Sequence, residues 1–172
     1  MATNLEFIKS EIVNDVISFS MTDCFSDKYE NYFVTIQGLD HNLTSRHVTM
    51  LRFINSSGVV TSANYDMAKL GMRANNTFSD DYGIALTSIH EISADGYGKG
   101  SGTSFYVYNP YSSSNYTFVN YQVSAYYDIH GSLRGVKGIG VLNIAETHLG
   151  FNIFDFGGFK MYNGKISVFG VK

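Results

Sequence analysis

The sequence has little charge, no tryptophan, one proline and one cysteine. Charged residues make up 16% of its 172 residues, against ~25% in a typical soluble domain, and the formal net charge is −3. Because this balance provides no positive field to attract phosphates, we expect no sequence-independent binding of nucleic acid. Phenylalanine and tyrosine supply an aromatic content of 15%. Low charge with many aromatic residues favours β-structure over disorder.

The lone cysteine, Cys24, limits the chemistry that is open to the chain. It excludes an intrachain disulfide and any zinc site that needs two or more thiolates. The neighbouring Asp23 should raise the pKa of the thiol. We therefore expect Cys24 to be a buried small hydrophobe and not a nucleophile.

The scarcity of proline and of charged runs also bears on domain organisation. Pro110 is the only proline, and no Pro-rich, Gly/Ser-only or charged stretch forms a linker, which predicts a single domain over residues 1–172. The N-terminal residues lack a basic segment followed by an apolar one, and no window approaches about 18 uninterrupted apolar residues. We therefore predict a soluble protein with no signal peptide and no membrane span.

Short runs rich in β-branched and aromatic residues recur between Gly-, Asn- and Ser-rich turns every ~8–12 residues. They predict strands at residues 5–9, 16–21, 28–37, 47–54, 84–89, 104–108, 116–124, 136–142, 151–156 and 165–169. The expected fold is all-β, an antiparallel β-sandwich of jelly-roll type with at most one short helix. Residues 65–72 either form that helix, because Tyr65, Ala68 and Met72 have helical spacing, or cross irregularly between sheets. Asn163 and Gly164 are a type I′ turn pair and predict a C-terminal hairpin.

Signals for catalysis or metal binding are weak throughout the sequence. The glycine-rich residues 93–102 lack the spacing of a phosphate-binding loop and indicate a flexible contact loop. Asp128 and His130 lie on one side of a strand, as a base or a metal ligand would, but a surface pair at a turn is the simpler interpretation. The acids at 80, 81 and 95 do not form a calcium-binding loop, and the five histidines lack metal-ligand spacing.

Sugar hydrolysis needs two carboxylates roughly 5–10 Å apart, and Glu91, Glu146 and Asp155 are the candidates. Nothing in the sequence brings any two of them together. We predict no catalytic residue, no cofactor and no metal.

Aromatic residues interleaved with polar ones are the more informative pattern. Amphipathic rings suit stacking on glycans or burial in protein interfaces, although many rings simply fill a core. The candidate binding residues are Tyr97, Tyr106, Tyr108, Tyr111, Tyr126 and Tyr127.

A series of segments along nearly the whole chain carries a family resemblance. They are residues 7–9, 16–19, 22–32 (TDCFSDKYENY), 51–53, 63–66, 106–110 (YVYNP), 116–118, 138–141 (GIGV) and 164–171 (GKISVFGV). In this order they resemble small β-rich virion proteins of marine, cyanophage-like tailed bacteriophages. The similarity is a pattern of strands and turns and contains no catalytic signature.

The resemblance implies a non-enzymatic virion surface protein, here a head decoration or accessory protein that attaches to the capsid lattice. We expect a homo-oligomer that docks on other virion proteins by aromatic and strand-edge surfaces, with Phe7 and Ile8 as the attachment residues. The alternative is a tail-fibre or receptor-binding module that recognises a host-surface glycan through residues 96–102 and the tyrosines. A glycan-degrading enzyme is the third and weakest hypothesis. Neither nucleic acid nor membrane is an expected partner.

Overall fold

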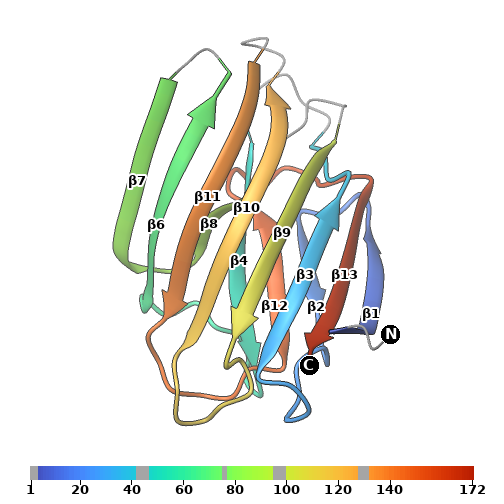
Figure 1. Cartoon of the computed structure of the whole chain (residues 1–172), viewed down its shortest axis with the longest axis vertical. Coiled ribbons are helices and arrows are strands. Elements are labelled where there is room, and N and C mark those ends of the chain that lie inside the picture. Colours follow the sequence, from blue (N-terminus) through green and yellow to red (C-terminus); the bar gives the residue numbers. More distant parts are fainter. Residues whose placement is uncertain (1–3, 42–46, 75–76, 95–99, 128–131) are drawn as a thin grey trace.

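A computed structural model describes residues 4–41, 47–74, 77–94, 100–127 and 132–172. The described residues form two antiparallel sheets and no helix, as Figure 1 shows. The absence of any helix in the described part of the chain also means that none there could cross a membrane. The all-β antiparallel sandwich predicted from the sequence is confirmed.

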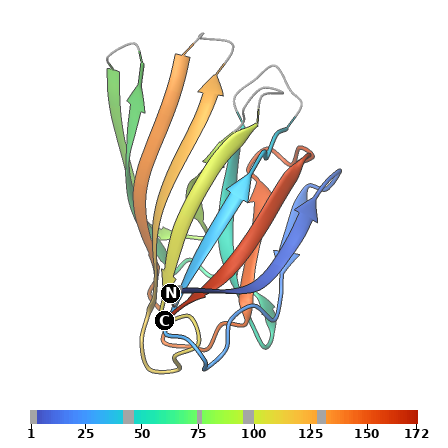
Figure 2. The ribbon, with the colours of Figure 1, turned by 45° about the vertical axis from the view of Figure 1, so that its right-hand side comes forward.

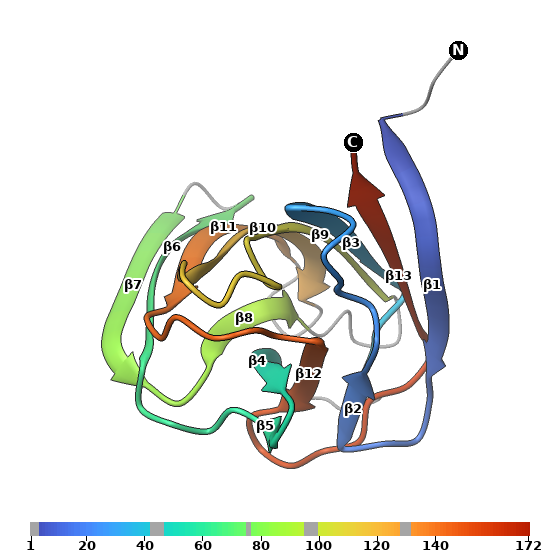
Figure 3. The ribbon, with the colours of Figure 1, turned by 90° about the horizontal axis from the view of Figure 1, so that it is seen from below.

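The larger sheet has eight strands and the smaller one five. Along the larger sheet the order is β1 (Leu5–Val13), β13 (Gly164–Val171), β3 (Asn31–Gln37), β9 (Ser101–Tyr108), β10 (Thr117–Tyr127), β11 (Ser132–Leu142), β6 (Tyr65–Arg73) and β7 (Thr77–Leu86). The smaller sheet runs β2 (Ser18–Met21), β12 (Gly150–Asp155), β4 (Val48–Asn55) and β5 (Gly58–Val59), and β8 (Ile89–Ala94) also pairs with β4. Seen from below, the larger sheet curves around the smaller one (Figure 3).

The hydrophobic core lies between the sheets because strands alternate buried and exposed residues. In β3, Tyr32, Val34 and Ile36 are fully buried while the residues between them are only half-buried. Tyr121 of β10 lies flat against β11 at Gly138, where a Cβ atom would come within 2.2 Å of the tyrosine Cζ. The Tyr121 hydroxyl donates to the His90 carbonyl oxygen at 2.9 Å, and this bond ties the larger sheet to β8.

The helix proposed for residues 65–72 is wrong, because this segment is strand β6, paired with both β11 and β7. The positions that suggested a helix, Tyr65, Ala68 and Met72, do not share a face. Tyr65 is buried between the sheets, whereas Ala68 and Met72 are exposed. Pairing on both sides supplies the backbone hydrogen bonds that a two-turn helix would have supplied locally.

Two other local predictions are wrong because the chain changes sheet there. The predicted strand at 84–89 spans a corner, with β7 ending at Leu86 and β8 beginning at Ile89. The predicted C-terminal hairpin fails because β12 belongs to the smaller sheet and β13 to the larger. Asn163 does adopt a positive φ of 57°, but Gly164 is buried against Leu39 where the chain crosses to β13.

Candidate binding face

Five aromatic rings form a row on the outer face of the larger sheet, the face turned away from the smaller sheet. We call it the aromatic row: Phe7, Phe169, Phe33, Tyr106 and Tyr108, from β1, β13, β3 and β9. The centroid distances along the row are 5.8 Å, 6.3 Å, 4.9 Å and 6.1 Å. All lie in the range in which rings attract each other. Side chains as far apart as positions 7 and 169 therefore make one continuous surface.

Strand register produces the row. Phe7 is opposite Phe169, Phe169 opposite Phe33, and Phe33 opposite Tyr106, so their side chains stand on one face at one level. A water-facing side of an antiparallel sheet is usually polar, so a row of rings there is unusual. The rings shield one another: Phe33, Phe169 and Tyr108 are half-buried, and Phe7 at the edge strand is 60% exposed.

Polar groups lie along one side of the row. Thr35, Ser104 and Ser167 occupy the next level of the same face, by register. Glu6 faces the other side of β1 by alternation from Phe7, and it forms ion pairs with Lys28 and Lys172 at the edge of the sheet. The Lys28 ammonium group lowers the pKa of Glu6 to about 2, so this carboxylate stays ionised. An apolar centre with a polar rim is the composition of protein interfaces.

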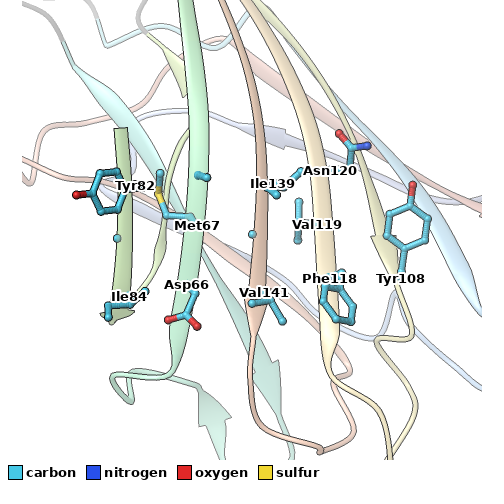
Figure 4. A pocket seen from close by; sticks show the side chains of 13 residues that line it. Asp66, Met67, Tyr82, Ile84, Tyr108, Phe118, Val119, Asn120, Ile139 and Val141 are labelled. Atoms are coloured by element: carbon cyan, nitrogen blue, oxygen red, sulfur yellow. The ribbon is translucent and has the colours of Figure 1, made fainter. Parts of the chain in front are cut away.

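Next to the row, the outer face contains a shallow groove of about 510 Å³ (Figure 4). Tyr108 and Phe118 stand on one side of it, and Tyr82 and Ile84 stand on the other. Besides the two tyrosine hydroxyls, the polar side chains of its lining are Asp66 and Asn120.

The Asp66 carboxylate already has hydrogen-bond donors of its own. It accepts bonds from the Ala85 backbone N–H at 2.9 Å and from Asn143 Nδ2 at 3.2 Å. Few polar groups therefore remain in the groove to recognise a polar ligand.

Beyond the groove, apolar side chains cover the outer face of β6, β7 and β11. We call this region the apolar wing: Leu70, Met72, Phe78, Tyr82, Ile84, Leu133 and Ile139. Phe78, Tyr82 and Ile84 are 76%, 80% and 77% exposed. In Figure 2 this end of the larger sheet stands away from the smaller sheet. The wing is not among the surfaces predicted from the sequence, although apolar residues at 78, 82 and 84 are an alternation signal.

The structure brings together three of the residues singled out from the sequence. Phe7, Tyr106 and Tyr108 all belong to the aromatic row. Ile8, the second expected attachment residue, is partly buried and packs against the core.

The other candidate tyrosines lie elsewhere. Tyr126 is exposed on β10 opposite Leu133, toward the far end of the strand, and Tyr111 is exposed beyond the end of β9. Tyr127 ends β10, and its side chain lies outside the description. Tyr97 lies outside the described residues altogether.

The three carboxylates considered for hydrolysis have separate sets of partners. Glu91 contacts Lys69 Nζ at 2.8 Å and Arg134 Nη2 at 2.7 Å. Glu146 contacts His148 Nε2 at 3.2 Å and Asn55 Nδ2 at 3.0 Å. No partner in these contacts is shared, and we find no acid pair bridging a cleft among them.

Asp155 is the third of these carboxylates, and it is buried with two histidines. One of its oxygens, Oδ2, lies 3.3 Å from His41 Nε2 and 3.3 Å from His47 Nδ1. The other, Oδ1, accepts hydrogen bonds from the backbone N–H groups of Gly157 and Phe159. Burial lowers the pKa of His41, and the nearby Asp155 carboxylate opposes that shift.

The other acidic residues and the histidine considered for metal binding or catalysis do not form a site in the described part of the chain. Asp81 pairs with Lys69 at 3.0 Å, whereas Asp80 lies on the outer face of β7 by register, so the two acids diverge. Asp95, Asp128 and His130 lie outside the described residues. Across the described ranges, no group of three or more His, Cys, Asp or Glu side chains could hold a metal ion.

Cys24 is buried, as the sequence predicted, and its thiol contacts the Met21 carbonyl oxygen at 3.6 Å. Burial raises the pKa of the thiol to about 12, and the charge of Asp23 adds only a minor contribution. The residue is therefore a structural hydrophobe, mainly because it is buried and only slightly because of its acidic neighbour.

Comparisons with known proteins add no family assignment. No protein-family model matches the chain, and no curated protein matches it.

Proposed function

We propose that the chain is a non-enzymatic bacteriophage virion surface protein, a head decoration or accessory protein of jelly-roll type that attaches to the capsid lattice as a homo-oligomer. The resemblance of its strand and turn segments to phage virion proteins supports the virion assignment. The aromatic row supports attachment through a protein interface, and it is the observation on which the proposal depends.

The row suits attachment for physical reasons. Its rings already contact one another, so little side-chain freedom is lost when a partner covers them. The hydroxyl groups alongside can form hydrogen bonds with a partner and fix its orientation. On a repeating lattice, weak contacts made by each copy of an oligomer add up to tight attachment.

Cosedimentation of the purified protein with particles that lack it tests this proposal. We expect saturable binding, and we expect it to weaken about tenfold or more in Tyr106→Ser, because central aromatic residues dominate interface energies. Tyr116→Ser is the matched control, since Tyr116 is exposed but lies outside the row. Absence of binding to particles, or equal loss in both variants, would contradict attachment through the row.

Recognition of a host-surface glycan by a tail-fibre module is a second candidate function. Tyr106 and Tyr108 favour it, since their rings stack nearly parallel, 19° apart, and a pair of exposed amphipathic rings can contact a sugar ring. This function predicts binding to host cells or to their polysaccharide, lost in the Tyr106→Ala and Tyr108→Ala variants and kept in Phe7→Ser. Such a result, with no binding to particles, would replace the decoration proposal.

A further inference from the structure

The polarity of the sheet is reversed in the apolar wing. Elsewhere the inner side of the larger sheet is apolar and packs on the smaller sheet, including in the strands whose outer side carries the aromatic row. In β6 and β7, that inner side carries Lys69, Arg73, Ser79 and Asp81, by strand alternation from buried Met67. The outer side carries the apolar residues instead. The wing therefore has a hydrophobic face, and no described part of this chain covers it.

We infer that a second copy of this chain covers the apolar wing. The two copies pack face to face, and the two-fold axis that relates them lies between their β6 strands and runs parallel to them. The inference deepens the homo-oligomer part of the proposed function by naming the surface at which copies meet. It does not depend on the particle to which the oligomer attaches.

The exposed area of the wing is large enough for such an interface. From the exposed fractions of its side chains, the wing offers on the order of 800 Å² of apolar surface, about what each partner buries in a stable complex. A typical monomer exposes no patch beyond roughly 300–600 Å². Left in water, the wing would promote non-specific association.

Charge on this face complements itself under the proposed symmetry. Asp80 of β7 and Lys137 of β11 both lie level with Leu70 of β6, one on each side of it. Two strand spacings separate their backbones by about 10 Å, with Leu70 between them. Rotation about β6 brings Asp80 of each copy over Lys137 of the other, giving two ion pairs around a Leu70–Leu70 contact.

The neighbouring levels of this face bring apolar side chains together. One level along, Phe78 of β7 and Gly135 of β11 flank Met72. The same rotation places each Phe78 ring over Gly135 and the Met72 methyl group of the other copy, since Met72 Cε lies 3.2 Å from the position of a Gly135 Cβ atom. On the opposite side of the Leu70 level, Tyr82 meets Ile139 in the same way, across the small Ala68.

The sheet edges favour this face-to-face arrangement over strand addition. The edge strand β7 carries consecutive acids, Asp80 and Asp81, and its register with β6 shifts between Tyr65 and Met67. The opposite edge, β1, is interrupted by a shift between Phe7 and Lys9. Charges and irregularities of this kind hinder the pairing of edges. A closed two-fold pair then results, and not an open-ended sheet.

Sedimentation velocity of the purified full chain, without particles or cells, tests the inference. We expect a concentration-dependent dimer, weakened at least tenfold by Asp80→Lys and by Lys137→Asp, because each single change brings like charges together. The double variant should restore dimerisation. Phe78→Ser should weaken the dimer, and it should fold normally because Phe78 is so exposed. Phe7→Ser, in the aromatic row, is the control and should leave it unchanged.

A monomer at every concentration would overturn the inference, and so would a dimer that none of the wing variants affects. Single variants that weaken the dimer, with no recovery in the double variant, would overturn the two-fold arrangement along β6. Failure to bind particles would contradict the proposed function alone, because this measurement contains no particles.

Discussion

The aromatic row and the apolar wing, the two halves of the outer face, differ in how far their apolar side chains are exposed to water. In the aromatic row, each ring contacts the next and hydroxyl groups lie alongside, so the surface is partly shielded before any partner arrives. In the apolar wing, Phe78 and Tyr82 are more than three-quarters exposed. The row is suited to a reversible contact, because it can remain exposed to water. The wing is suited to a permanent contact. Outward-facing hydrophobic residues on one sheet can thus serve two kinds of contact.

The largest expected effect comes from removing the buried ion pairs on the inner side of β6 and β11, behind the wing. Glu91 is fully buried and holds the charges of Lys69 and Arg134. Glu91→Ala would leave two cations without this carboxylate, and we expect it to cost about 3–5 kcal/mol of the free energy of unfolding. Urea denaturation measures this loss. Glu6→Ala, which breaks a solvent-exposed ion-pair cluster at the edge of the larger sheet, should unfold almost like the original protein, and equal losses in the two variants would contradict the distinction.

The next effect concerns the strands that join the two halves. Gly138→Ala would place a methyl group against the Tyr121 ring and displace the hydrogen bond to His90. We expect destabilisation of about 2–3 kcal/mol, from strain and the lost bond together. Gly102→Ala is the matched control, because nothing lies within 4 Å of a Cβ atom at that position. Thermal unfolding that ranks the control as the more damaged variant would refute the packing argument.

A pair of phenylalanine substitutions compares the halves directly. Phe33 of the row is half-buried among other rings, so Phe33→Ala should cost about 1–2 kcal/mol of folding stability. Phe78→Ala in the wing should change the stability of the monomer by less than about 0.5 kcal/mol. Both are measured by denaturant unfolding at concentrations too low for dimerisation. Equal costs would mean that the wing is packed within the chain.

The most gradual effect is that of pH. Burial lowers the pKa of His41 and of His148. In the unfolded chain these side chains take up protons near pH 6.5, while the folded protein resists protonation there. The free energy of unfolding should therefore be steady above that pH and fall below it, by up to about 1.4 kcal/mol per pH unit for each histidine. His41→Gln should reduce this slope, and an unchanged slope would exclude His41 as a source.

The sequence predicted those features that depend on local composition. Runs of β-branched and aromatic residues located most strands. The sequence also predicts Phe7 as an attachment residue and Tyr106 and Tyr108 as binding residues, each from its own segment. Their alignment itself was not predictable, because it depends on the register of strands far apart in the sequence. Even within β9, alternation alone does not tell which side of the strand faces the core.

The failures share a physical cause, since local signals cannot reveal the sheet to which a strand belongs. The pair Asn163–Gly164 has the local preferences of a hairpin turn, yet the chain uses it while crossing between sheets. Residues 84–89 have the composition of one strand, yet a corner at Thr87 and Ser88 divides them. In β6, sparse apolar positions resembled a helix because half of its apolar residues face away from the core, in the wing.

The buried thiol of Cys24 can be used to measure local opening of the hydrophobic core. Cys24 is 2% exposed and, with its pKa raised to about 12, resists alkylating reagents while the fold is intact. Its labelling rate under native conditions therefore reads out how often the core around it opens. The same inertness means that a cysteine introduced on the row or on the wing would be the reactive thiol in the folded chain. A spectroscopic or cross-linking probe could then be placed on either surface without first removing a native cysteine.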